Sequence, residues 1–256
     1  MNPVLFPFVL DGFPRCGSTT LMRILSSHPD IECCMEPFHP KRFGGEFNRL
    51  ALQHQSVAAP LDLIRLRWNG LKHVWEPGTG WPFVENPGLN DDLVRNAGIV
   101  VSLRRRNLLR QFVSGYVCKR LGFWVGTSAE FYARLDSAYL PPIALSEASA
   151  ALTHAKEALD RRDELLGSLP VKKLVLYYED IFEGNDNPDR QANFCNWLFV
   201  QLGHRPLESD AFKDCLRQYL SPAEYKWANN DVYARIPGSR VLDEKIGNDA
   251  TGRLFT

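Results

Sequence analysis

The chain has 256 residues, enough to bury a large core, and its 45% apolar and 23% charged content is ordinary for a globular protein. Lysine plus arginine and aspartate plus glutamate number 30 each, so the formal net charge is zero. Proteins that bind nucleic acid by bulk charge usually show a basic excess, so nucleic acid is not the expected partner. A local basic pocket is still compatible with this balance.

Several functional classes lack their usual signals in this sequence. No apolar run approaches the roughly 20 residues of a transmembrane helix, so no stable membrane insertion is expected. The segment MNPVLFPFVLDGF has neither the basic start nor the cleavage site of a signal peptide, which predicts a cytoplasmic protein. The six cysteines form no CxxC pair, which argues against a zinc site and favours reduced core thiols.

Short apolar runs alternate with helical spacings along the chain. The runs predict strands over Val4–Leu10, Ile31–Met35, Gly70–Trp75, Ile99–Leu103 and Val171–Tyr177. The spacings predict helices over Leu21–Leu25, Leu61–Arg67, Asn107–Leu121, Ser146–Leu166 and Pro188–Leu202. Loops are expected over residues 37–48, near the site, and over the Gly- and Pro-rich stretch Trp75–Leu89. This alternation predicts a parallel sheet with helical crossovers, which binds ligands at the carboxyl ends of its strands.

Residues 13–20 read FPRCGSTT and lie between the first expected strand and the first expected helix. The first N–H groups of a helix have no intrahelical partner, and the helix dipole there favours negative charge. Arg15 adds a planar fork of donors, and Ser18 and Thr19 add hydroxyl donors. We therefore expect this loop to bind a phosphate or sulfate. It is not a Walker A loop, because no lysine stands at the required place, which disfavours an ATP or GTP hydrolase.

A second anion site is expected where the strand Ile99–Leu103 runs into the next helix. Arg106 lies at the exit of the strand, and Ser114 follows eight residues later, about two helical turns on. A charged fork and a hydroxyl can converge on one anion. Two anion sites at strand-to-helix junctions suggest a single ligand with phosphates at two ends.

At these residues the chain resembles sulfotransferases that use 3′-phosphoadenosine 5′-phosphosulfate (PAPS). Their 5′-phosphosulfate loop reads P-[RK]-[ST]-G-[ST]-[ST]-x-L, and Pro14–Leu21 matches it except that Cys16 replaces Ser or Thr. Their 3′-phosphate element is an arginine followed eight residues later by a serine, as Arg106 and Ser114 are here. The third landmark of the resemblance is a strand leading to Tyr178-Glu179-Asp180.

Within that family, the stretch Ser26–Pro37 most resembles carbohydrate-modifying enzymes, which have His-Pro-x-[IV] followed by Glu-Pro. The resemblance implies one domain over residues 1–256, with a P-loop-like three-layer α/β fold whose central parallel sheet is flanked by helices. It implies sulfuryl transfer from PAPS to a hydroxyl of a carbohydrate or glycolipid, with PAP as product and no metal. Two departures stand out: Gly238-Ser239-Arg240 and Gly247–Arg253 only loosely replace the Arg-Lys-Gly element of aryl and steroid enzymes, and no catalytic histidine is obvious.

The resemblance also implies roles for individual residues. The residues expected to bind the nucleotide are Arg15, Cys16, Gly17, Ser18, Thr19, Thr20, Arg106, Ser114 and Tyr178. In the implied reaction Arg15 would stabilise charge on the leaving oxygen. The choice of Glu36 as general base comes from its position instead, because it follows the second expected strand and should face the same pocket, where partial burial would raise its pKa. His39 is the alternative base, and Lys72 is a candidate for stabilising the transferring group.

Simpler structural interpretations remain open for most of these residues. Arg106 has Arg104, Arg105 and Arg110 as neighbours and could belong to a solvated basic face, and Ser114 could be a helix-surface serine. Glu36 could be a cap or an ion-pair partner, Lys72 an edge charge, and Tyr178 part of strand-end packing. Among functions, the alternatives are a nucleotide-dependent kinase or phosphotransferase of P-loop fold and a non-catalytic nucleotide-binding protein. Neither the acceptor nor the oligomeric state can be predicted from these residues.

Overall fold

We describe residues 5–76, 78–124, 126–183, 187–220 and 230–255 of a computed structural model of the chain. The chain divides into two compact units, each formed from two stretches of sequence. The first unit is Met1–Arg104 with Ala158–Leu216, and the second is Arg105–Glu157 with Arg217–Thr256. The prediction of a single domain over residues 1–256 stays a prediction.

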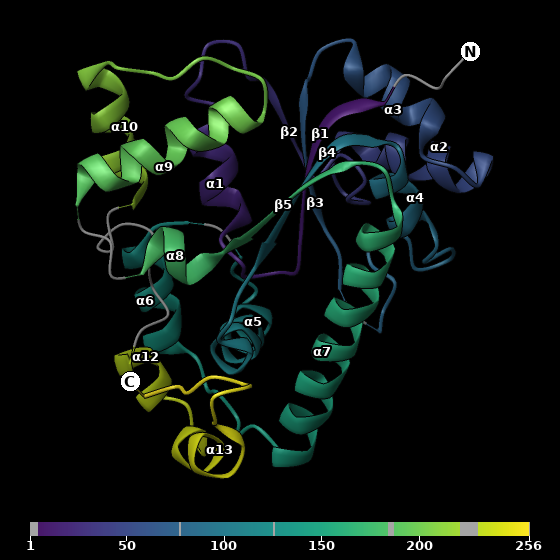
Figure 1. Cartoon of the computed structure of the whole chain (residues 1–256). Coiled ribbons are helices and arrows are strands. Elements are labelled where there is room, and N and C mark those ends of the chain that lie inside the picture. Colours follow the sequence, from purple (N-terminus) through teal and green to yellow (C-terminus); the bar gives the residue numbers. More distant parts are fainter. Residues whose placement is uncertain (1–4, 77, 125, 184–186, 221–229, 256) are drawn as a thin grey trace. The chain divides into compact units, whose positions relative to one another are not determined.

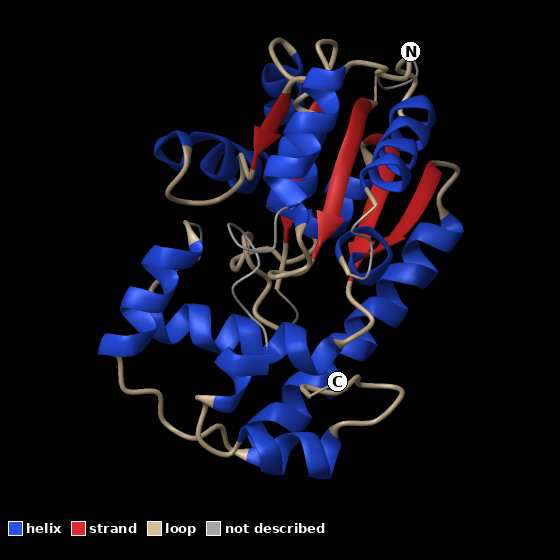
Figure 2. Cartoon of the chain, turned by 90° about the vertical axis from the view of Figure 1, so that its left-hand side faces the viewer, coloured by secondary structure: helices blue, strands red, loops and turns tan. Residues whose placement is uncertain are grey.

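The first unit holds a five-stranded sheet in the order β2-β3-β1-β4-β5, and all its neighbouring strands pair in parallel (Figure 2). The fold is therefore α/β with a central parallel sheet flanked by helices, as predicted. The strands are β1 (Phe6–Gly12), β2 (Cys33–Met35), β3 (Gly70–Val74), β4 (Ala97–Arg104) and β5 (Lys172–Tyr177). All five predicted strands are present; Val4 of the first prediction lies outside the described residues.

The helices of the first unit cover both faces of its sheet. They are α1 (Ser18–Leu25), the 3₁₀ turn η1 (Phe43–Gly45), α2 (Glu46–His54), α3 (Ala58–Arg65), α4 (Leu89–Arg95), α7 (Leu145–Ser168) from Ala158 on, α8 (Tyr178–Phe182), α9 (Pro188–Gln201) and α10 (Asp210–Leu220) up to Leu216. Helices α1 and α9 lie on one side of the sheet, and α2, α3 and α4 lie on the other (Figure 1). The loop predicted over residues 37–48 ends earlier than expected, because η1 and the start of α2 fall within it.

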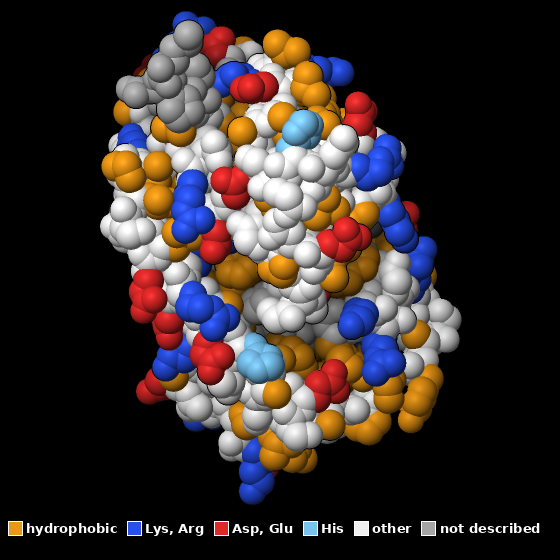
Figure 3. Space-filling model, turned by 90° about the vertical axis from the view of Figure 1, so that its right-hand side faces the viewer, with side chains coloured by type: hydrophobic (Ala, Val, Ile, Leu, Met, Phe, Trp, Pro, Cys, Tyr) orange, Lys and Arg blue, Asp and Glu red, His pale blue; other side chains and the backbone are white. Residues whose placement is uncertain are grey.

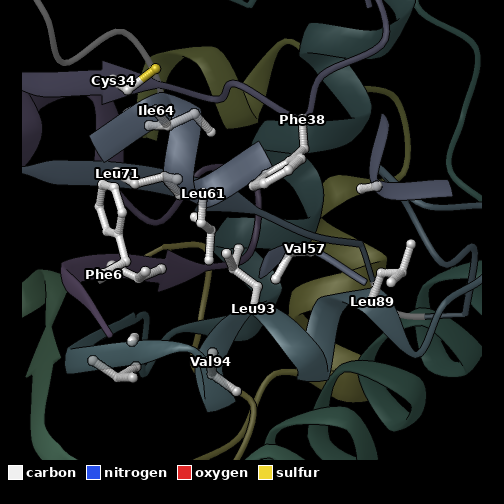
Figure 4. Packing of buried hydrophobic residues seen from close by; sticks show 14 of the residues in the cluster. Phe6, Cys34, Phe38, Val57, Leu61, Ile64, Leu71, Leu89, Leu93 and Val94 are labelled. Atoms are coloured by element: carbon white, nitrogen blue, oxygen red, sulfur yellow. The ribbon is translucent and has the colours of Figure 1, made fainter. Parts of the chain in front are cut away.

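The core beneath α2, α3 and α4 combines strand residues such as Leu71 with helix residues such as Leu61 and Leu93 (Figure 4). Val9 of β1 lies in register with Leu71 of β3 and Val100 of β4, and all three side chains are fully buried. Because strand side chains alternate between faces, the next residues, such as Leu10 and Lys72, face α1 instead. This alternation separates Lys72 from its neighbour His73, as the sequence predicts.

The second unit, taken by itself, is helical. Its elements are α5 (Leu108–Leu121), α6 (Ser128–Ser137), the first part of α7, α12 (Asn230–Ala234) and α13 (Ser239–Ile246). Tyr116 of α5 donates to the carbonyl of Pro141 over 3.0 Å, and Arg235 pairs with Asp136 at 2.5 Å. Across both units, the helices without a counterpart in the sequence-based prediction are α2, α4, α6, α8, α10, α12 and α13.

Charges of both signs are interspersed on the face drawn in Figure 3, in keeping with the zero net charge. Among the described helices, none combines the length and the apolar character needed to cross a membrane. All six cysteines are free thiols.

Candidate anion-binding site

The loop between β1 and α1 has the backbone of a tight, cation-bearing turn. Strand β1 ends at Gly12 and α1 begins at Ser18, with Gly17 at the N-cap in the left-handed region at φ 88°. Arg15 is also left-handed, at φ 65°, a conformation that costs a non-glycine residue free energy and is often found at functional sites. The first N–H groups of α1 follow directly, so the local geometry is that of an anion cradle.

Helix α8 covers the loop glycine. A Cβ atom added to Gly17 would lie 2.7 Å from Phe182 Cε2 and 2.9 Å from Tyr178 Cδ2. The Tyr178 and Phe182 rings also pack on each other with their centroids 4.9 Å apart. The structure thus brings Tyr178 against the loop with which the sequence associated it. Phe182 is a contact that no motif in the sequence indicates.

Cys16, the irregular residue of the motif, points into the protein. Its side chain is 0% exposed, and a Cβ on Gly12 would come within 2.9 Å of its sulfur. Burial raises the pKa of the Cys16 thiol, against the lowering effect of hydrogen bonding with Ser18. The position where Cys16 replaces the Ser or Thr of the motif is therefore buried, and only the backbone of Cys16 is available to a ligand.

Lys72 brings to the loop the lysine that the loop sequence itself lacks. Its ammonium nitrogen donates to Thr19 Oγ1 over 2.7 Å and lies 2.5 Å from Glu36 Oε1. Lys72 is 4% exposed, and the strand that carries it, β3, lies between β2 and β1 in the sheet. Lys72 is therefore not the edge charge that the sequence left open. A lysine reaches the first turn of α1 from a neighbouring strand, 53 residues away in sequence from Thr19.

Glu36 follows β2 directly and holds a left-handed backbone at φ 52°. It joins the loop through Lys72 and lies 3.8 Å from the Arg42 guanidinium. Burial alone would raise the pKa of Glu36, but Lys72, with a contribution from Arg42, outweighs it, so the pKa is lowered. The expected raised pKa is therefore wrong. Glu36 is held as a carboxylate.

His39 is near Glu36 but is tied into its own turn. Its backbone N–H donates to the Glu36 carbonyl over 3.0 Å, and its Nδ1 accepts from the Lys41 N–H over 3.0 Å. With Nδ1 accepting, Nε2 carries the proton of the neutral ring and has no lone pair for an acceptor hydroxyl. Burial also lowers the pKa of His39. This geometry favours Glu36 over His39 as the base.

The predicted 3′-phosphate residues belong to the second unit. Arg106 is exposed and comes just before α5, whereas Ser114 is 3% exposed and lies within α5. The buried environment rules out a helix-surface serine. Their convergence on one anion stays a prediction.

The C-terminal segment packs at the start of α5, next in sequence to Arg106. The Leu109 N–H donates to the Thr251 carbonyl over 2.9 Å, and Asn107 Nδ2 donates to the Arg253 carbonyl over 2.7 Å. Gly252 is left-handed at φ 81°, and a Cβ there would overlap the Asn107 side chain. Of the two loose substitutes for the family's glycine-containing element, Gly247–Arg253 is thus beside the expected second anion site, within the same unit.

Among the described residues, one group could offer three metal ligands: His28, Asp30 and His204, with ligand atoms within 4.8 Å of one another. His28 already uses both ring nitrogens, since Nδ1 accepts from the Asp30 N–H and Nε2 contacts the Arg205 carbonyl over 2.9 Å. The group follows the C-terminal end of α1, whereas the loop is at its N-terminal end.

No protein-family model matches the chain, and no curated protein is a recognisable relative of it.

Proposed function

We propose that the chain is a sulfotransferase that moves the sulfuryl group of PAPS to a hydroxyl of a carbohydrate or glycolipid acceptor. The observation that carries the proposal is the connection of Glu36 to the loop helix through Lys72, at 2.5 Å and 2.7 Å. In sulfuryl transfer to a hydroxyl, a carboxylate can accept the hydroxyl proton, and a buried ammonium and the start of α1 can stabilise the negative charge of the transferring group. The resemblance of Pro14–Leu21 to the 5′-phosphosulfate loop supplies the choice of donor.

On the donor side, Arg15 and the N–H groups at the start of α1 would hold the 5′-phosphate and the bridging oxygen. Negative charge builds on that oxygen as its bond to sulfur breaks, by analogy with phosphoryl transfer. A preorganised donor aimed at such an oxygen typically contributes about 3–4 kcal/mol to lowering the barrier. Arg15 is therefore assigned to stabilise the leaving group, and PAP is the product released.

On the acceptor side, Glu36 would take the proton of the attacking hydroxyl while the oxygen of that hydroxyl forms the new bond to sulfur. Lys72 has three N–H donors, and Thr19 and Glu36 engage two of them. The third can reach an oxygen of the transferring group. The lowered pKa makes Glu36 a weak base that is ionised at neutral pH, so transfer should persist well below pH 7.

The proposal is tested by calorimetric titration of the whole chain with PAP, ADP and ATP. PAP should bind most tightly, and Arg106→Ala should weaken the binding of PAP far more than that of adenosine 5′-monophosphate, which is PAP without its 3′-phosphate. Equal losses for both nucleotides would remove Arg106 from the 3′ site. Preference for ATP with Mg²⁺-dependent turnover would replace the proposal by a phosphotransferase.

A second step separates catalysis from binding. Glu36→Gln should keep PAP affinity within about threefold but lower sulfuryl transfer at least 100-fold, as loss of a general base typically does. Transfer would be screened with labelled PAPS over sugars, glycolipids and phenols. Tight PAP binding with no transfer to any acceptor would instead indicate a non-catalytic nucleotide-binding protein.

A further inference from the structure

Arg162 of α7 is a buried charge on the side of the sheet opposite to Lys72, and the proposed reaction does not use it. It is 2% exposed. Its Nη1 donates to Asp91 Oδ1 over 2.9 Å and to the Asn90 carbonyl over 3.3 Å. Its Nε lies 3.4 Å from Asp11 Oδ2, and its guanidinium carbon lies 4.3 Å from the centroid of the Trp75 ring.

These partners come from both ends of one loop. Trp75 is the first residue after β3, and Asn90 and Asp91 are in the first turn of α4, so Arg162 contacts each end of the segment 75–89. Asn90 extends the connection into the segment, because its Nδ2 donates to the carbonyls of Gly80 and Pro87, each over 3.1 Å. Its Oδ1 is in turn 3.0 Å from His73 Nε2 on β3.

The same cluster reaches the residues just before the anion-binding loop. Asp11 is the last residue but one of β1. The Trp75 N–H donates to the Gly12 carbonyl over 3.2 Å, and the Trp75 ring packs edge-on against Phe13 at 4.7 Å. One arginine therefore contacts the strand that leads into the anion-binding loop and both ends of segment 75–89.

Stability alone does not account for this cluster. Replacing a buried ion pair by apolar residues is often neutral or stabilising, because removing charges from water is costly. Here Asp11 and Arg162 are both buried, their ion contact is long at 3.4 Å, and Arg162 Nη2 has no hydrogen-bond partner among the described residues. Burial raises the pKa of Asp11, although Arg162 opposes the rise. The cluster is costly, so its function should be what it positions.

We propose that Arg162 is a positioning residue that fixes segment 75–89 to the end of β1, and so sets the position of this segment relative to the anion-binding loop. The segment also carries Trp81, whose ring packs edge-on at 5.0 Å against His39, three residues from Glu36. Arg162 thus acts at a distance on the surroundings of the proposed base. The inference rests on contacts within the first unit and does not depend on which group the enzyme transfers.

Hydrogen exchange followed by mass spectrometry tests this role, with Asp11→Asn, Arg162→Met and the double variant compared with the wild type. Asp11→Asn removes only the pair with β1, so exchange in segment 75–89 should stay within about twofold of wild type. Arg162→Met should lower stability and speed exchange in that segment at least tenfold. The matched control is Arg161→Met, an exposed neighbour on α7.

The double variant Asp11→Asn/Arg162→Met separates positioning from charge compensation. It leaves no buried Asp11 charge uncompensated, so it should regain most of the stability lost in Arg162→Met. If Arg162 positions the segment, exchange over residues 75–89 in the double variant stays at least tenfold faster than in the wild type, while β1 regains its protection against exchange. Return of that segment to wild-type exchange would overturn the proposal and reduce Arg162 to a counterion for Asp11.

Discussion

Lys72→Met gives the most direct test of the site, because the lysine connects Thr19 to Glu36. At 2.5 Å and an effective dielectric constant of about 20, Coulomb's law gives about 7 kcal/mol of attraction between Lys72 and Glu36. The cost of burying both charges offsets part of it. Breaking one partner of a buried pair typically costs about 3–5 kcal/mol, and the Glu36 side chain is 21% exposed, so we expect about 3 kcal/mol.

The assay is a double-mutant cycle on the free energy of unfolding in urea. Lys72→Met should cost about 3 kcal/mol, whereas Lys72→Met/Glu36→Gln should cost less than the two single changes together, since no charge is left unpaired. The pKa of Glu36, followed by carboxyl NMR in Lys72→Met, should rise above its wild-type position because burial then dominates. Single changes that add to within about 0.5 kcal/mol would refute the pairing.

Three further changes probe the loop and the buried histidine. Arg15→Ala should abolish transfer and weaken PAP in calorimetry at least tenfold, while Arg23→Ala in the last turn of α1 leaves both unchanged; equal effects would remove Arg15 from the site. Gly17→Ala should cost about 2–4 kcal/mol in urea unfolding, from its φ of 88° and the overlap with α8, and an unchanged midpoint would contradict this packing. Burial lowers the pKa of His73 to about 3, so the unfolded chain alone binds this proton between about pH 3 and 6.5, and wild-type stability should fall as pH drops through that window. His73→Gln should lose less stability than wild type between pH 7 and 5, by about 2 kcal/mol, and identical pH profiles would rule out the buried neutral ring.

The strands could be predicted to within two residues at each end, because a buried parallel strand is a short apolar run whatever surrounds it. Helices were harder to predict from the sequence than strands. The segment Glu46–His54 is helical, yet the pair Gly44-Gly45 before it indicates a turn and conceals the helix start. Helix α8 is only five residues long, too short for any helical spacing to show in the sequence.

In the candidate site, too, local features could be predicted from the sequence and contacts between distant residues could not. The loop residues are consecutive, so the turn before α1 and its candidate ligand groups could be predicted from the order of Arg15, Gly17 and Ser18 alone. The contact of Lys72 with Thr19 depends on which strand lies beside β1, and on which face of β3 the lysine occupies. The lowered pKa of Glu36 depends on that same contact. Sequence proximity carries no information about either.

The origin of the lysine changes how the loop must recognise an anion. In a Walker loop the lysine is bound to the phosphates and is part of the loop itself. Here Lys72 is held by a carboxylate at 2.5 Å, so most of its charge is already balanced before any ligand arrives. In the proposed function, the net attraction for the 5′-phosphate would then come from Arg15 and the N–H groups of α1. An anion that draws Lys72 toward itself weakens its hold on Glu36, which raises the pKa of the carboxylate and makes it a better base. In the proposed reaction, donor binding and activation of the base would thus be coupled through one ammonium group.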